Sequence, residues 1–102
     1  GTWELALDAA EGLAPFAAAV PLCGMVMNTH RLPELANYPL WVFHGANDRT
    51  NPCIHDDEAV AAILEAGANR GDEPTLRYTR YEYSPGFANY EGHACWEQAY
   101  AD

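Results

Sequence analysis

At 102 residues the chain is long enough for one domain at most, and 49% hydrophobic with 20% charged residues is typical of a globular protein. Its net charge of −10 disfavours nucleic acid and anionic membrane surfaces as partners, because neither attracts an acidic protein. The longest apolar run, residues 16–20, is far too short to span a bilayer.

The first part of the chain predicts a helix followed by a strand. Residues 2–10 have helical periodicity, with Trp3 and Leu7 on one face. Residues 16–23 are an almost unbroken apolar run, which predicts a parallel strand buried on both faces. Residues 25–39 contain two prolines and mixed polarity, so a loop with one helical turn is expected there.

The rest of the chain repeats the alternation of strand and helix. Residues 40–43 are the clearest strand, because they are apolar and aromatic and end at a His-Gly pair. A helix opened by aspartates is predicted over residues 56–66, a strand over 76–83 and a short helix over 95–100. Strands that alternate with helices form parallel sheets. The expected fold class is therefore α/β, with three parallel strands and flanking helices.

Asp48 and His93 are the candidate catalytic residues. Asp48 follows the strand at residues 40–43, and His93 follows the strand-like run at residues 76–83. Ligands of parallel sheets bind at the carboxyl ends of the strands, so both loops are expected at one edge. A carboxylate that orients an imidazole is two-thirds of a Ser-His-Asp triad. Spacing alone also permits a turn aspartate and a loop histidine that never meet.

The nucleophile of such a triad is not evident in the chain. In α/β-hydrolases the serine precedes the acid, and the acid precedes the histidine. The one serine of the sequence, Ser84, lies between Asp48 and His93, and nothing around it resembles a strand–elbow–helix. We therefore expect the nucleophile upstream of Gly1.

Other candidates have simpler structural interpretations. His44 ends a buried strand, which favours a structural histidine over a ligand. Trp96 is expected to pack against the sheet rather than to line a pocket. Four potential metal ligands also lie close together after the acid loop: Cys53, His55, Asp56 and Asp57. Their spacing matches no zinc pattern, so a loop and an acidic helix start are favoured there.

The cysteines leave two alternatives open. If the loops of the acid and the base converge, Cys53 and Cys95 converge with them, and a disulfide could tie the loops together while Cys23 stays buried and reduced. The other alternative is three reduced thiols. A disulfide would require an oxidising compartment, and a secreted or periplasmic location is favoured.

Several segments, taken in order, resemble one branch of the α/β-hydrolase fold, the bacterial "predicted peptidase" and feruloyl-esterase-like proteins. Residues 44–52, HGANDRTNP, resemble the HGxxDxxxP acid loop of these esterases. Residues 1–7 resemble the helix that follows the GxSxG nucleophile elbow, and residues 16–24 resemble the next strand. Residues 76–81 and 92–100 resemble the last strand and the histidine loop.

The resemblance implies that residues 1–102 are the C-terminal part of an α/β-hydrolase domain without the half that carries the nucleophile. It implies hydrolysis of a small-molecule carboxylic ester, or of a peptide, with Asp48 as acid and His93 as base and with no cofactor or metal. The alternatives are a non-catalytic hydrolase-fold binding module and a dienelactone-hydrolase-like enzyme with a cysteine nucleophile. The loop from Ser84 to Glu91 is longer than usual for this branch, which leaves the substrate class open. Nothing in the sequence indicates an oligomeric state.

Overall fold

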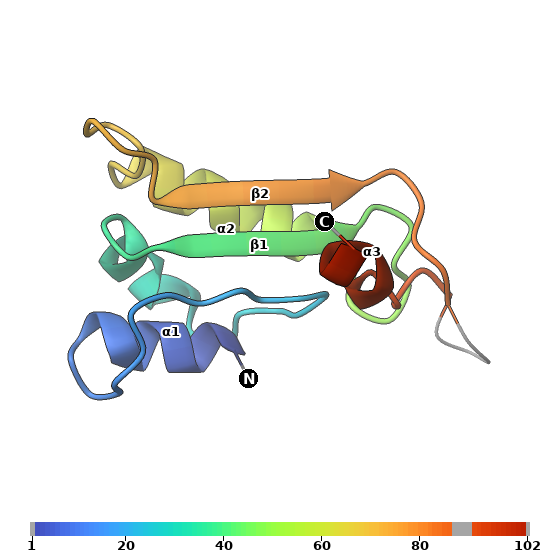
Figure 1. The fold of residues 1–102 in the computed structure, drawn as a ribbon, viewed down its shortest axis with the longest axis horizontal. Coiled ribbons are helices and arrows are strands. Elements are labelled where there is room, and N and C mark those ends of the chain that lie inside the picture. The colour runs from blue at the N-terminus through green and yellow to red at the C-terminus, as the bar shows by residue number, and fades with distance from the viewer. Residues whose placement is uncertain (1, 87–90, 102) are drawn as a thin grey trace.

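The computed structural model describes residues 2–86 and 91–101 of the chain. Its elements are, in order, α1 (Thr2–Ala10), the 3-10 helix η1 (Thr29–Leu35), β1 (Leu40–Gly45), α2 (Ile54–Glu65), β2 (Leu76–Tyr81) and α3 (Trp96–Ala101) (Figure 1). Among the described residues, no helix is long and apolar enough to cross a membrane.

The two strands form a parallel sheet, as the alternation of strands and helices predicts. β1 and β2 pair in register, from Leu40 opposite Leu76 to Gly45 opposite Tyr81. Because the pairing is parallel, the carboxyl ends of both strands lie at the same edge of the sheet (Figure 1). The chain crosses from β1 to β2 through α2, which is the usual connection between neighbouring parallel strands.

The predicted third strand, residues 16–23, is not a regular strand in the described structure. This segment runs parallel to β1 and makes isolated bridges from Ala19 to Leu40 and from Leu22 to Phe43. Pro21 lies between the bridges and has no N–H to donate, so the hydrogen-bond ladder is interrupted there. The described sheet therefore has two strands, where the sequence predicted three.

The same segment is also less buried than predicted. Phe16 is 51% exposed and Val20 is 47% exposed, whereas a strand covered on both faces was expected. The segment lies at the outer edge of the described sheet, with β1 on one side only. A hollow of about 230 Å³ between this edge and α1 is lined by apolar side chains that include Leu5, Phe16 and Val20.

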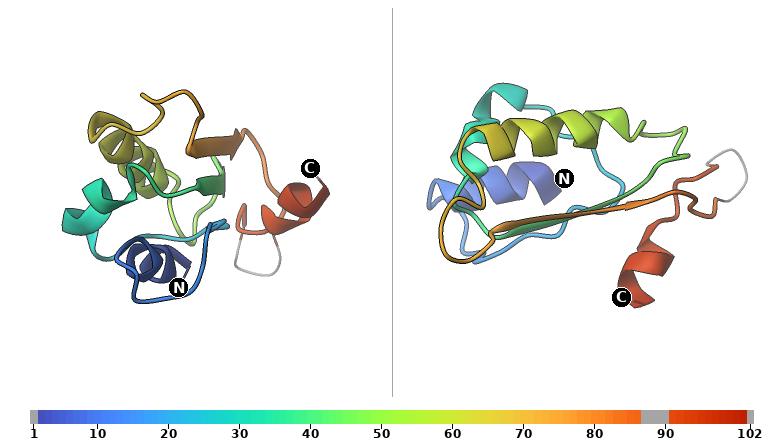
Figure 2. Two further views of the ribbon diagram at one scale, coloured as in Figure 1. Left: turned by 60° about the vertical axis from the view of Figure 1, so that its left-hand side comes forward. Right: turned by 90° about the horizontal axis from the view of Figure 1, so that it is seen from above.

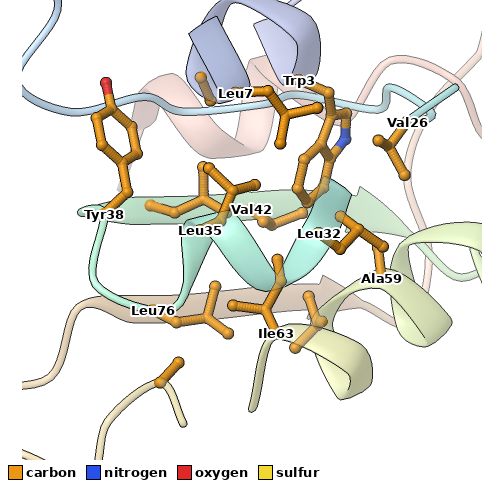
Figure 3. Packing of buried hydrophobic residues seen from close by; sticks show 14 residues of the cluster. Trp3, Leu7, Val26, Leu32, Leu35, Tyr38, Val42, Ala59, Ile63 and Leu76 are labelled. Carbon is orange, nitrogen blue, oxygen red and sulfur yellow. The ribbon is translucent and has the colours of Figure 1, made fainter. Parts of the chain in front are cut away.

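The main hydrophobic core lies on one face of the sheet, under α1, η1 and α2. Trp3 and Leu7 of α1 are buried there as predicted, and they pack with Val42 of β1 and Ile63 of α2 (Figure 3). Each such side chain stabilises the fold by about 1.5–3 kcal/mol through removal of its apolar surface from water. This core fixes the sheet and therefore the positions at which its strands end.

A smaller cluster lies on the opposite face of the sheet, where α3 packs (Figure 2). Phe43 of β1 contacts Cys23 and Cys95 there, and Trp96 of α3 packs against them. The prediction that Trp96 packs against the sheet is confirmed. This cluster anchors the segment that carries His93 beside the end of β1.

Candidate active site

The candidate site begins where β1 and β2 end. The N–H of Ala46 donates to the carbonyl of Tyr81 at 2.7 Å, which extends the sheet pairing one residue beyond β1. The chain then turns, and the N–H of Asp48 donates to the carbonyl of Gly45 at 3.1 Å. This turn directs the Asp48 carboxylate toward the loop that follows β2.

Asp48 and His93 meet in the structure. Nδ1 of His93 lies 2.8 Å from Oδ2 of the buried Asp48 carboxylate. The other carboxylate oxygen, Oδ1, accepts the backbone N–H groups of Thr50 at 2.8 Å and Asn51 at 3.0 Å. Two backbone donors hold the carboxylate in one orientation, so its second oxygen stays directed at His93.

The hydrogen bond between these residues sets the tautomer of His93. A carboxylate can only accept, so the proton of the neutral ring lies on Nδ1 and the lone pair lies on Nε2. The His93 ring packs edge-on against Trp96, with 5.6 Å between the ring centroids. Its side chain is 19% exposed, whereas that of Asp48 is fully buried. The arrangement therefore presents an oriented base at the edge of the sheet.

Two glycines permit the close approach of the two loops. Gly92 has φ +75°, and a Cβ atom there would overlap the backbone carbonyl oxygen of Asn47. A Cβ atom at Gly45 would lie 2.6 Å from Oγ of Ser84 and 2.9 Å from the carbonyl oxygen of Gly92. Both positions require the absence of a side chain for the acid loop and the histidine loop to pack as they do.

Asn47 is a site residue that the sequence analysis missed. Its side-chain amide binds both backbone groups of Ser84: Nδ2 donates to the carbonyl at 3.0 Å, and Oδ1 accepts the N–H at 2.8 Å. The hydroxyl of Ser84 is buried and donates to Oε1 of Gln98 at 2.6 Å. Ser84 therefore joins the loop after β2 to the acid loop and to α3. The signal for Asn47 in the sequence was an amide at a strand-end turn, a position where side chains often bind backbone groups.

His44 is fully buried at the end of β1, as a structural histidine should be, but it also contacts the candidate site. Its Nδ1 lies 2.7 Å from Oδ2 of Asp56, and its Nε2 lies 2.6 Å from the carbonyl oxygen of Asn51. Nε2 also lies 3.1 Å from Oδ2 of Asp48. Burial lowers the pKa of His44, but the hydrogen bond and charge of Asp56, together with the carbonyl of Asn51 and the charge of Asp48, outweigh it, so the pKa is raised overall.

Asp56 does not open the helix, as the sequence predicted for the aspartates at this position. α2 begins at Ile54, two residues earlier than predicted, so Asp56 lies inside the first turn and turns inward to His44. Burial raises the pKa of Asp56, and the hydrogen bond from His44 opposes this change only in part.

The cysteine pairing in the structure differs from the one considered in the sequence analysis. Cys23 is bonded to Cys95 with 6.4 Å between the Cα atoms, and Cys53 is free and buried. Cys53 lies on the α2 side of the sheet, where its Sγ is 3.2 Å from the hydroxyl of Tyr78, whereas Cys95 lies on the α3 side with Phe43. A bridge from Cys53 to Cys95 would have to cross the sheet. The observed disulfide instead ties the His93 loop to the edge segment.

The four residues considered as metal ligands do not converge. Asp56 binds His44, whereas Asp57 accepts a hydrogen bond from the Tyr78 hydroxyl at 2.6 Å. Burial raises the pKa of Cys53, which favours the neutral thiol over the thiolate that metals bind. Among residues 2–86 and 91–101, no group of three or more histidines, cysteines or carboxylates could hold a metal ion.

Comparison with known proteins places the fold among esterases. No family model and no curated protein matches the chain. A solved structure described as "Crystal Structure of a Thermostable Esterase" matches the whole chain with 28% sequence identity and a TM-score of 0.75. The chain has an esterase-like fold. It spans 25% of the length of that esterase.

Proposed function

We propose that this chain supplies the acid and the base of a serine hydrolase that acts on carboxylic esters, with peptides as a second substrate class. The observation that carries the proposal is the hydrogen bond between Nδ1 of His93 and the buried carboxylate of Asp48, 2.8 Å long. The two residues lie on loops that follow neighbouring parallel strands, at the edge of the sheet where ligands of such folds bind.

In the proposed reaction His93 is the general base and then the general acid. Nε2 takes the proton of the serine hydroxyl as the oxygen attacks the ester carbonyl, and the ring becomes an imidazolium. The ionised carboxylate of Asp48 stabilises this positive charge through the hydrogen bond at Nδ1. The imidazolium then gives its proton to the leaving alkoxide.

We assign the nucleophile to a serine outside these 102 residues. The hydroxyl of Ser84 is buried and bonded to Gln98, so Ser84 is unsuited to attack a substrate. α1 runs antiparallel to the strands, with its first residues directed toward the carboxyl edge of the sheet (Figure 1). A serine just before α1 would therefore approach the edge at which His93 lies. A hollow of about 330 Å³ beside Trp3 and Met25 opens next to the start of this helix.

The test uses the longest polypeptide translated from the reading frame that contains these residues. We expect hydrolysis of p-nitrophenyl acetate and labelling by a fluorophosphonate probe, with peptide mapping that places the label on a serine before Gly1. His93→Ala should abolish labelling, and Arg49→Ala should leave it unchanged, because the side chain of Arg49 is exposed and forms an ion pair with the exposed Glu91 at 3.4 Å.

Three outcomes would overturn the assignment. Near-normal hydrolysis by His93→Ala would remove His93 from the reaction. Hydrolysis that iodoacetamide blocks and the fluorophosphonate probe does not would indicate a cysteine nucleophile. A folded protein with neither labelling nor hydrolysis would indicate a binding module.

A further inference from the structure

Behind the Asp48–His93 pair lies a second pair that the proposed reaction does not use. His44 and Asp56 are both fully buried, and Nδ1 of His44 lies 2.7 Å from Oδ2 of Asp56. The other ring nitrogen, Nε2, lies 2.6 Å from the carbonyl oxygen of Asn51 and 3.1 Å from Oδ2 of Asp48. That oxygen of Asp48 also accepts the hydrogen bond of His93. Two imidazoles thus share one carboxylate oxygen.

The surroundings of His44 favour a doubly protonated ring. A carbonyl oxygen can only accept, so the contact with Asn51 requires a proton on Nε2. Nδ1 faces the carboxylate of Asp56, which lies in the first turn of α2, where the helix dipole favours negative charge. The other groups that act on Asp56 are the indole of Trp3 and the carboxylate of Asp57. Each ring nitrogen of His44 therefore faces oxygen atoms that accept.

We infer that His44, held as an imidazolium by Asp56, is a second support of the Asp48 carboxylate and holds it in the position from which it accepts the hydrogen bond of His93. The reason is electrostatic, since a positive ring whose Nε2 lies 3.1 Å from Oδ2 of Asp48 attracts that oxygen. The contact between His44 and Asp48 is shielded from water, because both side chains are 0% exposed. Solvent therefore screens this contact weakly.

His44 is in this view a positioning residue, because it acts on His93 through Asp48. An effect of His44 on catalysis rests on the proposed function. The protonation states themselves exist in the resting chain and can be measured without any turnover.

The test is nitrogen NMR of the histidine rings during a pH titration of the ¹⁵N-labelled chain. We expect both nitrogens of His44 to be protonated at neutral pH. Asp56→Asn keeps the size of the side chain but removes its charge, so His44 should lose one of its two ring protons, and the Nδ1 proton resonance of His93, which reports its hydrogen bond to Asp48, should shift. His44→Gln should shift that resonance in the same direction. The matched control is His55→Gln, which removes an exposed histidine next to Asp56 and should not move it.

Two results would overturn the inference. One is an Nδ1 proton resonance of His93 that stays unchanged in folded Asp56→Asn. The other is a His44 ring with one unprotonated nitrogen at neutral pH in the unaltered chain, a measurement that requires no variant to fold. Hydrolysis without the expected NMR shift would reject this inference alone. The expected shift in a protein without hydrolysis would reject the proposed function and leave the shared carboxylate standing. In an active enzyme, Asp56→Asn should lower kcat, because Asp48 is held less firmly, and leave KM unchanged.

Discussion

Replacement of Gly92 by alanine should separate the acid loop from the histidine loop. Gly92 has φ +75°, and a Cβ atom there would overlap the backbone carbonyl of Asn47 and lie 2.8 Å from the backbone nitrogen of Asp48. Backbone atoms cannot rotate away as the end of a flexible side chain can. The loops must therefore move apart by a sizeable fraction of an ångström or more.

The size of the effect follows from what this movement breaks. The left-handed conformation alone costs a residue with a Cβ about 1 kcal/mol. Separation of the loops weakens the 2.8 Å hydrogen bond between His93 and Asp48, a charge-assisted bond that contributes about 2 kcal/mol. It also weakens the 3.2 Å backbone bond from Arg49 to Glu91, which contributes about 1 kcal/mol. We expect Gly92→Ala to lower the free energy of unfolding by about 4 kcal/mol and Tm by roughly 20 °C.

Gly12→Ala is the matched control. Gly12 also has a positive φ, +81°, but an added Cβ atom would meet nothing within 4 Å. In this variant the left-handed conformation alone should lower the free energy of unfolding, by about 1 kcal/mol, and Tm should fall by roughly 5 °C. Thermal unfolding followed by circular dichroism measures both, and the Nδ1 proton resonance of His93 reports its bond to Asp48. Equal stability losses in the two variants, with that resonance intact in Gly92→Ala, would refute the steric argument.

Three further predictions concern catalysis and the disulfide. In the active polypeptide, Asp48→Asn and His93→Ala should each lower the acylation rate by about 10³-fold or more, as stopped-flow kinetics would show, whereas Arg49→Ala should have little effect. The 102-residue chain by itself should neither hydrolyse p-nitrophenyl acetate nor take up a fluorophosphonate label, because it offers no suitable serine; serine-dependent turnover would contradict this. Replacement of Cys23 and Cys95 by serine should cost about 4 kcal/mol in urea unfolding, because the disulfide joins residues 72 apart in sequence; three alkylatable thiols in the oxidised native protein would show that no bridge forms.

Local sequence signals were sufficient for the elements that hold the site. The apolar run before the His-Gly pair became β1, and the helical periodicity of the first residues buried Trp3 and Leu7 in the core. The meeting of Asp48 and His93 followed from a rule of sheet geometry, because residues after neighbouring parallel strands emerge at one edge. These predictions depend on the spacing of apolar residues and on the order of strands and helices along the chain. Both can be read directly from a sequence.

Predictions that depended on which face of the sheet a residue occupies were wrong. Cys53 lies only five positions after Asp48, but by then the chain has turned under the sheet into α2, away from Cys95. Asp56 was expected at the start of a helix and instead lies inside the first turn of α2, buried against His44, because α2 starts earlier than predicted. The predicted third strand was interrupted by Pro21, whose missing N–H breaks the ladder. The partner of Cys95 and the burial of Asp56 depend on contacts between segments distant in sequence, which local patterns do not specify, whereas the missing N–H of Pro21 is a local signal that the sequence itself contains.

The two histidines that share Asp48 illustrate how structure separates a supporting residue from a reactive one. His44 and His93 contact the same carboxylate oxygen at 3.1 and 2.8 Å. The side chain of His44 is 0% exposed, and its two ring nitrogens face the oxygens of Asp56 and Asn51. Both nitrogens therefore have hydrogen-bond partners inside the protein. The ring of His93 is 19% exposed and lies at the carboxyl edge of the sheet. The partial exposure of His93 beside a fully buried carboxylate is the arrangement that proton exchange with a bound substrate requires.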